Sequence, residues 1–80
     1  MRYTVVVIPD AEDGGFFAYV PTIPNCFTHA DTLDDAMSMV QDAASALLAS
    51  MASHGEEVPI EAPGAMIASI EVEIPALTPA

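Results

Sequence analysis

The pattern of hydrophobic positions predicts three short strands, one helix and a final strand. Residues 3–8 are apolar and largely β-branched on both alternating faces, which is typical of a strand buried on both sides. The acidic stretch at residues 10–15 ends in two glycines, which supply the positive φ that a hairpin turn requires. A second strand is expected over residues 16–20 and, after a turn with two prolines, a third over residues 26–29.

An amphipathic helix is the clearest element of the sequence. Thr32 is a suitable N-cap, and Gly55 suits the position just after the last helical turn. Between these two ends, apolar residues recur at spacings of three and four, namely Leu33, Met37, Val40, Ala44, Leu47 and Met51. This stripe predicts the face of the helix that packs on the sheet.

A last strand is expected after the helix. Residues 56–64 contain two prolines and read as a linker. Residues 66–74 then place apolar side chains on one side and mostly polar ones on the other, a period of two that predicts a half-buried strand. Because only a central position explains two apolar faces on the first strand, we expect this fourth strand to lie parallel beside the first.

The resulting order is β-β-β-α-β, an α+β fold with a four-stranded mixed sheet and one helix packed on one face. Residues 1–75 are expected to form a single domain, and residues 76–80 a short C-terminal tail. One helix covers only one face of the sheet, so the opposite face stays apolar and exposed. We therefore expect a homodimer or homotetramer, with interface candidates Tyr3, Val5, Val7, Phe17 and Tyr19.

The acidic composition limits the classes of partner. The chain has 12 Asp and Glu residues against one basic side chain, Arg2, and its formal net charge is −11. Nucleic-acid binding depends on Lys and Arg that neutralise phosphates, so direct binding to DNA, RNA or an anionic membrane is not expected. A basic protein partner suits this charge. No stretch approaches the ~20 apolar residues of a membrane span, and no signal peptide is evident, so the expected location is the cytoplasm.

The residues with catalytic potential have simpler structural interpretations. Cys26 and His29 lie three residues apart on one expected strand, which directs them to opposite faces, and Cys26 is expected to be a small buried residue. A two-metal nuclease would need converging carboxylates such as Asp10, Asp31 and Asp35, but turn and helix-cap roles explain these residues better. We therefore expect no enzyme activity, no metal site and no cofactor.

Several short segments, in their order and spacing, resemble the HicB-like antitoxin family. They are YTVVV at residues 3–7, PD at 9–10, EDGGF at 12–16, AYVP at 18–21, IPNC at 23–26, DT at 31–32, DA at 35–36 and GEEVP at 55–59. Asn25 and Ala30 stand where the family usually has glycine, and Asn25 can still adopt positive φ. The resemblance implies a partial RNase H-like β-β-β-α-β fold.

The resemblance also implies a role as antitoxin to HicA, a small basic toxin that degrades mRNA and whose RNA-binding surface the antitoxin covers. Many family members carry a C-terminal DNA-binding segment; with one arginine, this chain is expected to be a short form without it. Acids in turns are the expected partner contacts, namely Asp10, Glu12, Asp13, Glu56 and Glu57. Two alternatives stay open: a degenerate RNase H-like metal-dependent nuclease, and a solitary oligomeric binding protein with no toxin partner.

Overall fold

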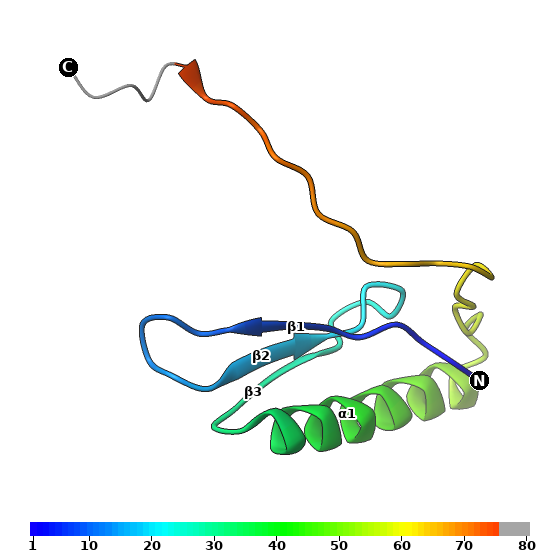
Figure 1. The fold of residues 1–80 in the computed structure, drawn as a ribbon. Helices are drawn as coiled ribbons and strands as arrows, with labels where there is room; N and C mark the ends of the chain where they lie inside the picture. Colours follow the sequence, from blue (N-terminus) through cyan, green and yellow to red (C-terminus); the bar gives the residue numbers. More distant parts are fainter. Residues whose placement is uncertain (76–80) are drawn as a thin grey trace.

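Three strands and one helix form an α+β fold in the computed structural model, which describes residues 1–75; the expected tail at 76–80 lies outside them. The elements are β1 (Val6–Pro9), β2 (Phe16–Tyr19), β3 (Phe27–Ala30) and α1 (Leu33–Ser53). The strands form one antiparallel sheet in the order β1-β2-β3, and α1 packs across one face of it (Figure 1). The predicted α+β class and the order β-β-β-α are confirmed.

The strand register assigns each side chain to one of two faces. Val7 pairs with Ala18, which pairs in turn with Thr28. Ala18 is fully buried, and the Thr28 hydroxyl donates to the carbonyl oxygen of Ala36 in α1 at 3.4 Å. This row of residues therefore faces the helix, and the rows on either side of it face away because successive strand residues alternate.

The buried core lies between the helix-facing row and α1. Its fully buried members are Ala18, Val20, Ile23, Cys26, Ala36 and Val40. Ile23 belongs to the loop between β2 and β3, which folds over the core through bonds from the Val20 N–H to the Cys26 carbonyl (3.0 Å) and from the Ile23 N–H to the Val20 carbonyl (3.2 Å). Asn25 has a φ of 62°, the left-handed conformation expected for it.

Both ends of α1 lie where the sequence predicts them. The Thr32 hydroxyl accepts a bond from the Asp35 N–H at 3.1 Å. At the other end, Gly55 has positive φ, and the Glu56 N–H donates to the Met51 carbonyl at 2.9 Å, which is the Schellman pattern. Leu33 and Met37 differ from their predicted core positions. Both are exposed, and Met37 lies beside the uncovered β1 edge of the sheet.

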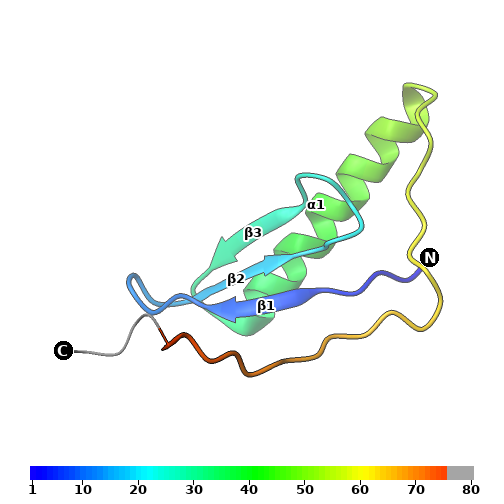
Figure 2. The same ribbon diagram turned by 90° about the horizontal axis from the view of Figure 1, so that it is seen from above.

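The first strand is shorter and less buried than predicted. It spans Val6–Pro9 and lies at an edge of the sheet, with Ile8 exposed, so the prediction of a central strand buried on both faces is wrong. The expected fourth strand is not part of the sheet: among the described residues, 66–74 pair with no strand, and they run apart from the sheet in both views (Figures 1 and 2). The period of two specifies an extended backbone and its sidedness, but not the neighbour that pairs with it.

Candidate partner-binding surface

The face of the sheet away from α1 carries an exposed apolar patch, here called the open face. The register places Val6, Tyr19 and Phe27 in one row across the three strands. Two residues further along β1, on the same face, Ile8, Phe17 and His29 form a second row. Ile8, Phe17, Tyr19 and Phe27 on this face are exposed and Val6 is half-buried, whereas the apolar side chains on the opposite face pack against the core. A patch of this kind usually marks an interaction site.

The interface candidates from the sequence do not share one face. Phe17 and Tyr19 lie on the open face. Tyr3, Val5 and Val7 instead pack against the core on the helix side. The antiparallel register explains this split, because Val7 lies opposite buried Ala18 while Val6 and Ile8 lie opposite Tyr19 and Phe17. β1 thus contributes its even-numbered residues to the open face.

An acidic turn at residues 10–13 connects β1 to β2 at one end of the open face. One oxygen of the Asp10 carboxylate accepts bonds from the backbone N–H groups of Glu12 (3.0 Å) and Asp13 (3.1 Å). The Asp10 N–H donates to the Gly15 carbonyl at 2.9 Å, which closes the turn. The side chains of Glu12 and Asp13 are left exposed, so they are accessible to a partner.

His29 ties this turn to the third strand. Its Nε2 lies 3.1 Å from the second carboxylate oxygen of Asp10 and 3.1 Å from the carbonyl oxygen of Gly14. Its ring also meets Phe17 edge-to-face, with centroids 4.7 Å apart. The bond from the Asp13 N–H lowers the pKa of Asp10; desolvation opposes this, and the Glu12 N–H and His29 add to it. Asp10 is therefore a charged structural residue, and its side chain is only 10% exposed.

The two groups of candidate acids lie far apart. Glu56 and Glu57 follow the C-terminal end of α1 and are exposed. The acidic turn lies at the opposite end of the molecule, as both ribbon views show (Figures 1 and 2). The two groups therefore do not form one continuous surface, and only the acidic turn borders the open face.

The residues considered for catalysis differ in their surroundings. Among residues 1–75, no group of three or more His, Cys, Asp or Glu side chains is placed to hold a metal ion. Asp31 and Asp35 line a shallow hollow together with His29, but Asp10 is bonded within its own turn. Burial raises the pKa of the Cys26 thiol, which keeps it protonated and weakly nucleophilic.

The described helix is also not long and apolar enough to cross a membrane.

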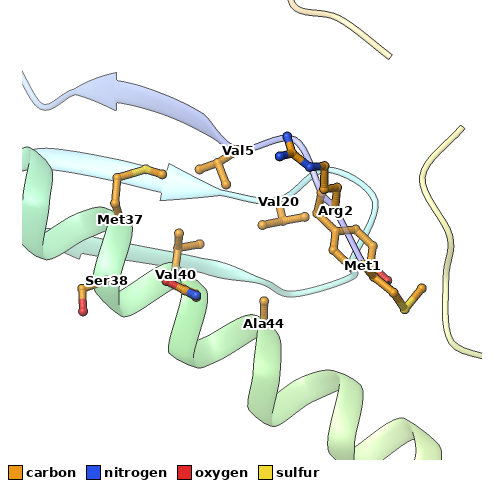
Figure 3. Close-up of a pocket in the computed structure, with 10 residues that line it drawn as sticks. Met1, Arg2, Val5, Val20, Met37, Ser38, Val40 and Ala44 are labelled. Atoms are coloured by element: carbon orange, nitrogen blue, oxygen red, sulfur yellow. The ribbon is translucent and has the colours of Figure 1, made fainter. Parts of the chain in front are cut away.

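An apolar groove opens at the free edge of β1, between the N-terminal segment and α1. Its volume is 510 Å³. Val5, Val20 and Val40 point into it, with Met37 at one side and Arg2 at its rim (Figure 3). The groove exposes one side of the core between sheet and helix.

Comparison with known proteins identifies the family. A family profile described as "HicB_like antitoxin of bacterial toxin-antitoxin system" matches residues 3–73. The chain belongs to the HicB-like antitoxin family. The resemblance inferred from the short sequence segments is thereby confirmed, and the match includes the segment after the helix.

Curated relatives of this HicB-like chain share most of its length. A UPF0150 protein of Thermoplasma acidophilum is 37% identical over 59 residues, which cover 74% of this chain and 84% of that protein. Antitoxin HicB 1 of Photorhabdus laumondii is 35% identical over 63 residues, 79% of this chain but 40% of that antitoxin. A UPF0150 protein of Archaeoglobus fulgidus is 40% identical over 43 residues, 54% of this chain and 61% of that protein. The chain thus spans less than half of the named antitoxin.

Sequence reasoning missed part of this surface. Val6, Ile8 and Phe27 are not among the interface candidates of the sequence, because the pattern alone does not show which side of each strand the helix covers. The available signal was the hairpin itself: a connection at residues 10–15 places Pro9 opposite Phe16 and fixes every pair behind them. The contact between His29 and Asp10 spans 19 residues and two strands, and local spacing could not reveal it.

Proposed function

We propose that this chain is the antitoxin of a toxin–antitoxin pair and neutralises a basic, HicA-type mRNA-degrading toxin by covering its RNA-binding surface. The observation that carries the proposal is the open face bordered by the acidic turn, in a chain of the HicB-like antitoxin family. Neutralisation is steric and electrostatic in this proposal, and requires no chemistry from the antitoxin itself.

Charge complementarity supports this choice of partner. A surface that binds RNA presents Lys and Arg to phosphates. This chain, with 12 acids and one basic side chain, offers carboxylates to the same cations. Opposite potentials raise the association rate, whereas the apolar contact of the open face supplies most of the affinity. The same charge disfavours binding of nucleic acid by the antitoxin alone.

The rigidity of the acidic turn also supports the proposal. Asp10 holds the turn through two backbone N–H groups and His29. A turn already fixed in the free protein loses little conformational entropy when a partner binds it. The backbone of Glu12 and Asp13 is thus held in one conformation, which favours recognition of a surface with a matching arrangement of cations.

The test begins with a gene for a short basic protein next to this one. The two proteins are co-expressed and co-purified at low and high salt, and cleavage of a model mRNA by the basic protein is measured with and without the antitoxin. We expect a complex that weakens as salt rises, because salt screens exposed charges, and we expect inhibition of RNA cleavage. A basic neighbour that cleaves RNA but neither binds this chain nor is inhibited by it would contradict the proposal.

Two matched pairs of variants locate the contact. Phe17→Ser on the open face should weaken the complex by roughly 10-fold or more, whereas Met39→Ser on α1 should leave it within ~3-fold. The two side chains have nearly equal exposure, 44% and 45%, so the comparison isolates position. Glu12→Lys should slow association more than Asp42→Lys on the helix, since both reverse one exposed charge. Equal effects within each pair would show that the toxin binds another surface.

A further inference from the structure

The segment at residues 66–74, here called the arm, is an apolar strand without a sheet. Its large apolar side chains are all exposed, namely Met66, Ile67, Ile70, Val72 and Ile74. Ile70 and Met66, at 85% and 83% exposure, are the most exposed large apolar side chains among the described residues. The radius of gyration is 16.3 Å, whereas a compact chain of this length has ~12 Å. The arm therefore carries a strand pattern that its own domain does not bury.

Two contacts hold residues 59–61, here called the root of the arm, beside the start of the sheet. The Tyr3 hydroxyl donates to the Pro59 carbonyl at 2.6 Å. The Thr4 hydroxyl donates to the Glu61 carboxylate at 2.8 Å, and the Thr4 N–H donates to the other oxygen of that carboxylate. The root is thus fixed near β1, although the arm beyond it is not.

A turn between the root and the arm directs the arm away from its own sheet. The Ala65 N–H donates to the Ala62 carbonyl at 3.3 Å. Gly64 has a φ of 82°, which a residue with a side chain adopts only with strain. After this turn the arm runs clear of the sheet in both views (Figures 1 and 2). The geometry therefore presents the arm to another molecule.

The surface that suits the arm is present on the same molecule. β1 is an edge strand, so its outer backbone groups are available to pair with an added strand. The groove lies beside this edge and exposes Val5, Val40 and Met37 (Figure 3). A strand with apolar side chains at alternate positions would pair with β1 and fill the groove with one side. Arg2, which makes no salt bridge among the described residues, lies at the rim of this groove.

We propose that two copies of this chain exchange arms, each pairing residues 66–74 with the β1 edge of the other and burying Met66, Ile70 and Val72 in its groove. The exchange adds a fourth strand to each sheet and covers the exposed side of Met37. It is reciprocal, so one contact type repeats around a two-fold axis, as in other strand-exchanged dimers. Glu71 and Glu73 face away from the groove, next to the open face, and leave that face available to a toxin.

The first test measures the mass of the protein at micromolar concentration by sedimentation. We expect about twice the 8.4 kDa of the chain. Ile70→Asp places a charge in the groove and should raise the dimer dissociation constant by roughly 10- to 100-fold. Ser69→Asp adds the same charge one residue earlier, on the outward side of the arm, and should change it by less than ~3-fold. Helical circular dichroism should be retained in both, since the arm is not part of the core of its own chain.

The second test separates exchange from an arm that folds back on its own β1. Isotope-labelled and unlabelled chains are unfolded together, refolded as an equal mixture and examined by isotope-filtered NMR. We expect contacts between the Val5 or Val7 methyls and those of Ile70 or Val72 to join labelled and unlabelled chains. Such contacts only within one chain, an 8.4 kDa monomer at micromolar concentration, or equal effects of Ile70→Asp and Ser69→Asp would each overturn the proposal.

Discussion

β1 and the arm have the same kind of sequence pattern but lie in different environments. Both are extended and rich in β-branched side chains, and both read as strands in the sequence. β1 pairs with β2 along its length, and its Val7 packs against the core. The arm pairs with no strand in residues 1–75, and Ile70 is 85% exposed. Alternation therefore encodes a side to be buried, while the neighbour that buries it comes from elsewhere in the chain or from another chain.

The connections next to β1 and next to the arm account for much of this difference. The hairpin at residues 10–15 returns the chain directly onto β1, so pairing follows within a few residues. The arm is preceded by a long helix and a proline-containing linker, and its last turn directs it away from the sheet. Three experiments on substituted proteins would break or sharpen this contrast.

The largest effect on stability is expected from a substitution in the buried core. Ile23→Ala removes a fully buried side chain from the loop that covers the core and should lower the free energy of unfolding by about 2–4 kcal/mol. Ile67→Ala removes the same atoms from the arm and should cost less than about 0.5 kcal/mol. Urea unfolding followed by circular dichroism, at concentrations where sedimentation shows monomer, measures both. Similar losses would mean that the arm packs on its own domain.

An intermediate effect is expected from the glycines of the two turns. Gly15 has a φ of 78°, and a Cβ there would collide with the Ala30 carbonyl oxygen, so Gly15→Ala should cost about 2–3 kcal/mol. Gly64 has similar φ, but a Cβ there meets nothing within 4 Å. Gly64→Ala should therefore cost about 1 kcal/mol, from backbone strain alone. Thermal unfolding of the two variants tests the difference, and a larger loss at Gly64 would show that the arm is held more tightly than the hairpin.

The smallest effect is expected from Asp10, whose pKa is lowered in the folded protein. A lowered folded-state pKa gives stability that is present above the unfolded pKa of about 3.9 and lost as pH falls through the lower folded value. Asp10→Asn should therefore lower the urea midpoint at pH 7, and its difference from the wild type should shrink toward pH 2–3. A constant difference across this range would mean that the Asp10 charge does not stabilise the turn. NMR titration of the carboxyl carbon measures the pKa directly.

Local signals predicted the parts of the fold that local physics controls. Thr32 and Gly55 mark the ends of α1 because capping depends only on nearby backbone groups. The two glycines and the acids before them located the hairpin for the same reason. The position of β1 at a sheet edge and the burial of Ile23 were not predicted, because both depend on which distant segments pack together.

The sequence predicted the kinds of residue in the candidate surface better than it predicted which residues share a face. Acidic turns and an uncovered apolar face were expected, and Phe17 and Tyr19 do lie on the open face. The assignment of Tyr3, Val5 and Val7 failed because the expected first strand lacked a register, and a shift of one residue exchanges its two faces. The bonds from His29 to the turn join strands that are distant in sequence, so no spacing rule reaches them.

The contacts at the root of the arm also set an order of events in folding. They join residues 56 and 57 positions apart, whereas the contact between His29 and Asp10 spans 19. Closing a loop three times longer in an unfolded chain costs about 1 kcal/mol more in entropy. We therefore expect the hairpins and α1 to form first, and the contact between Thr4 and Glu61, here called the clasp, to close last. In the native protein, the clasp should open without global unfolding, so the Thr4 amide should exchange its hydrogen faster than the amides of β2.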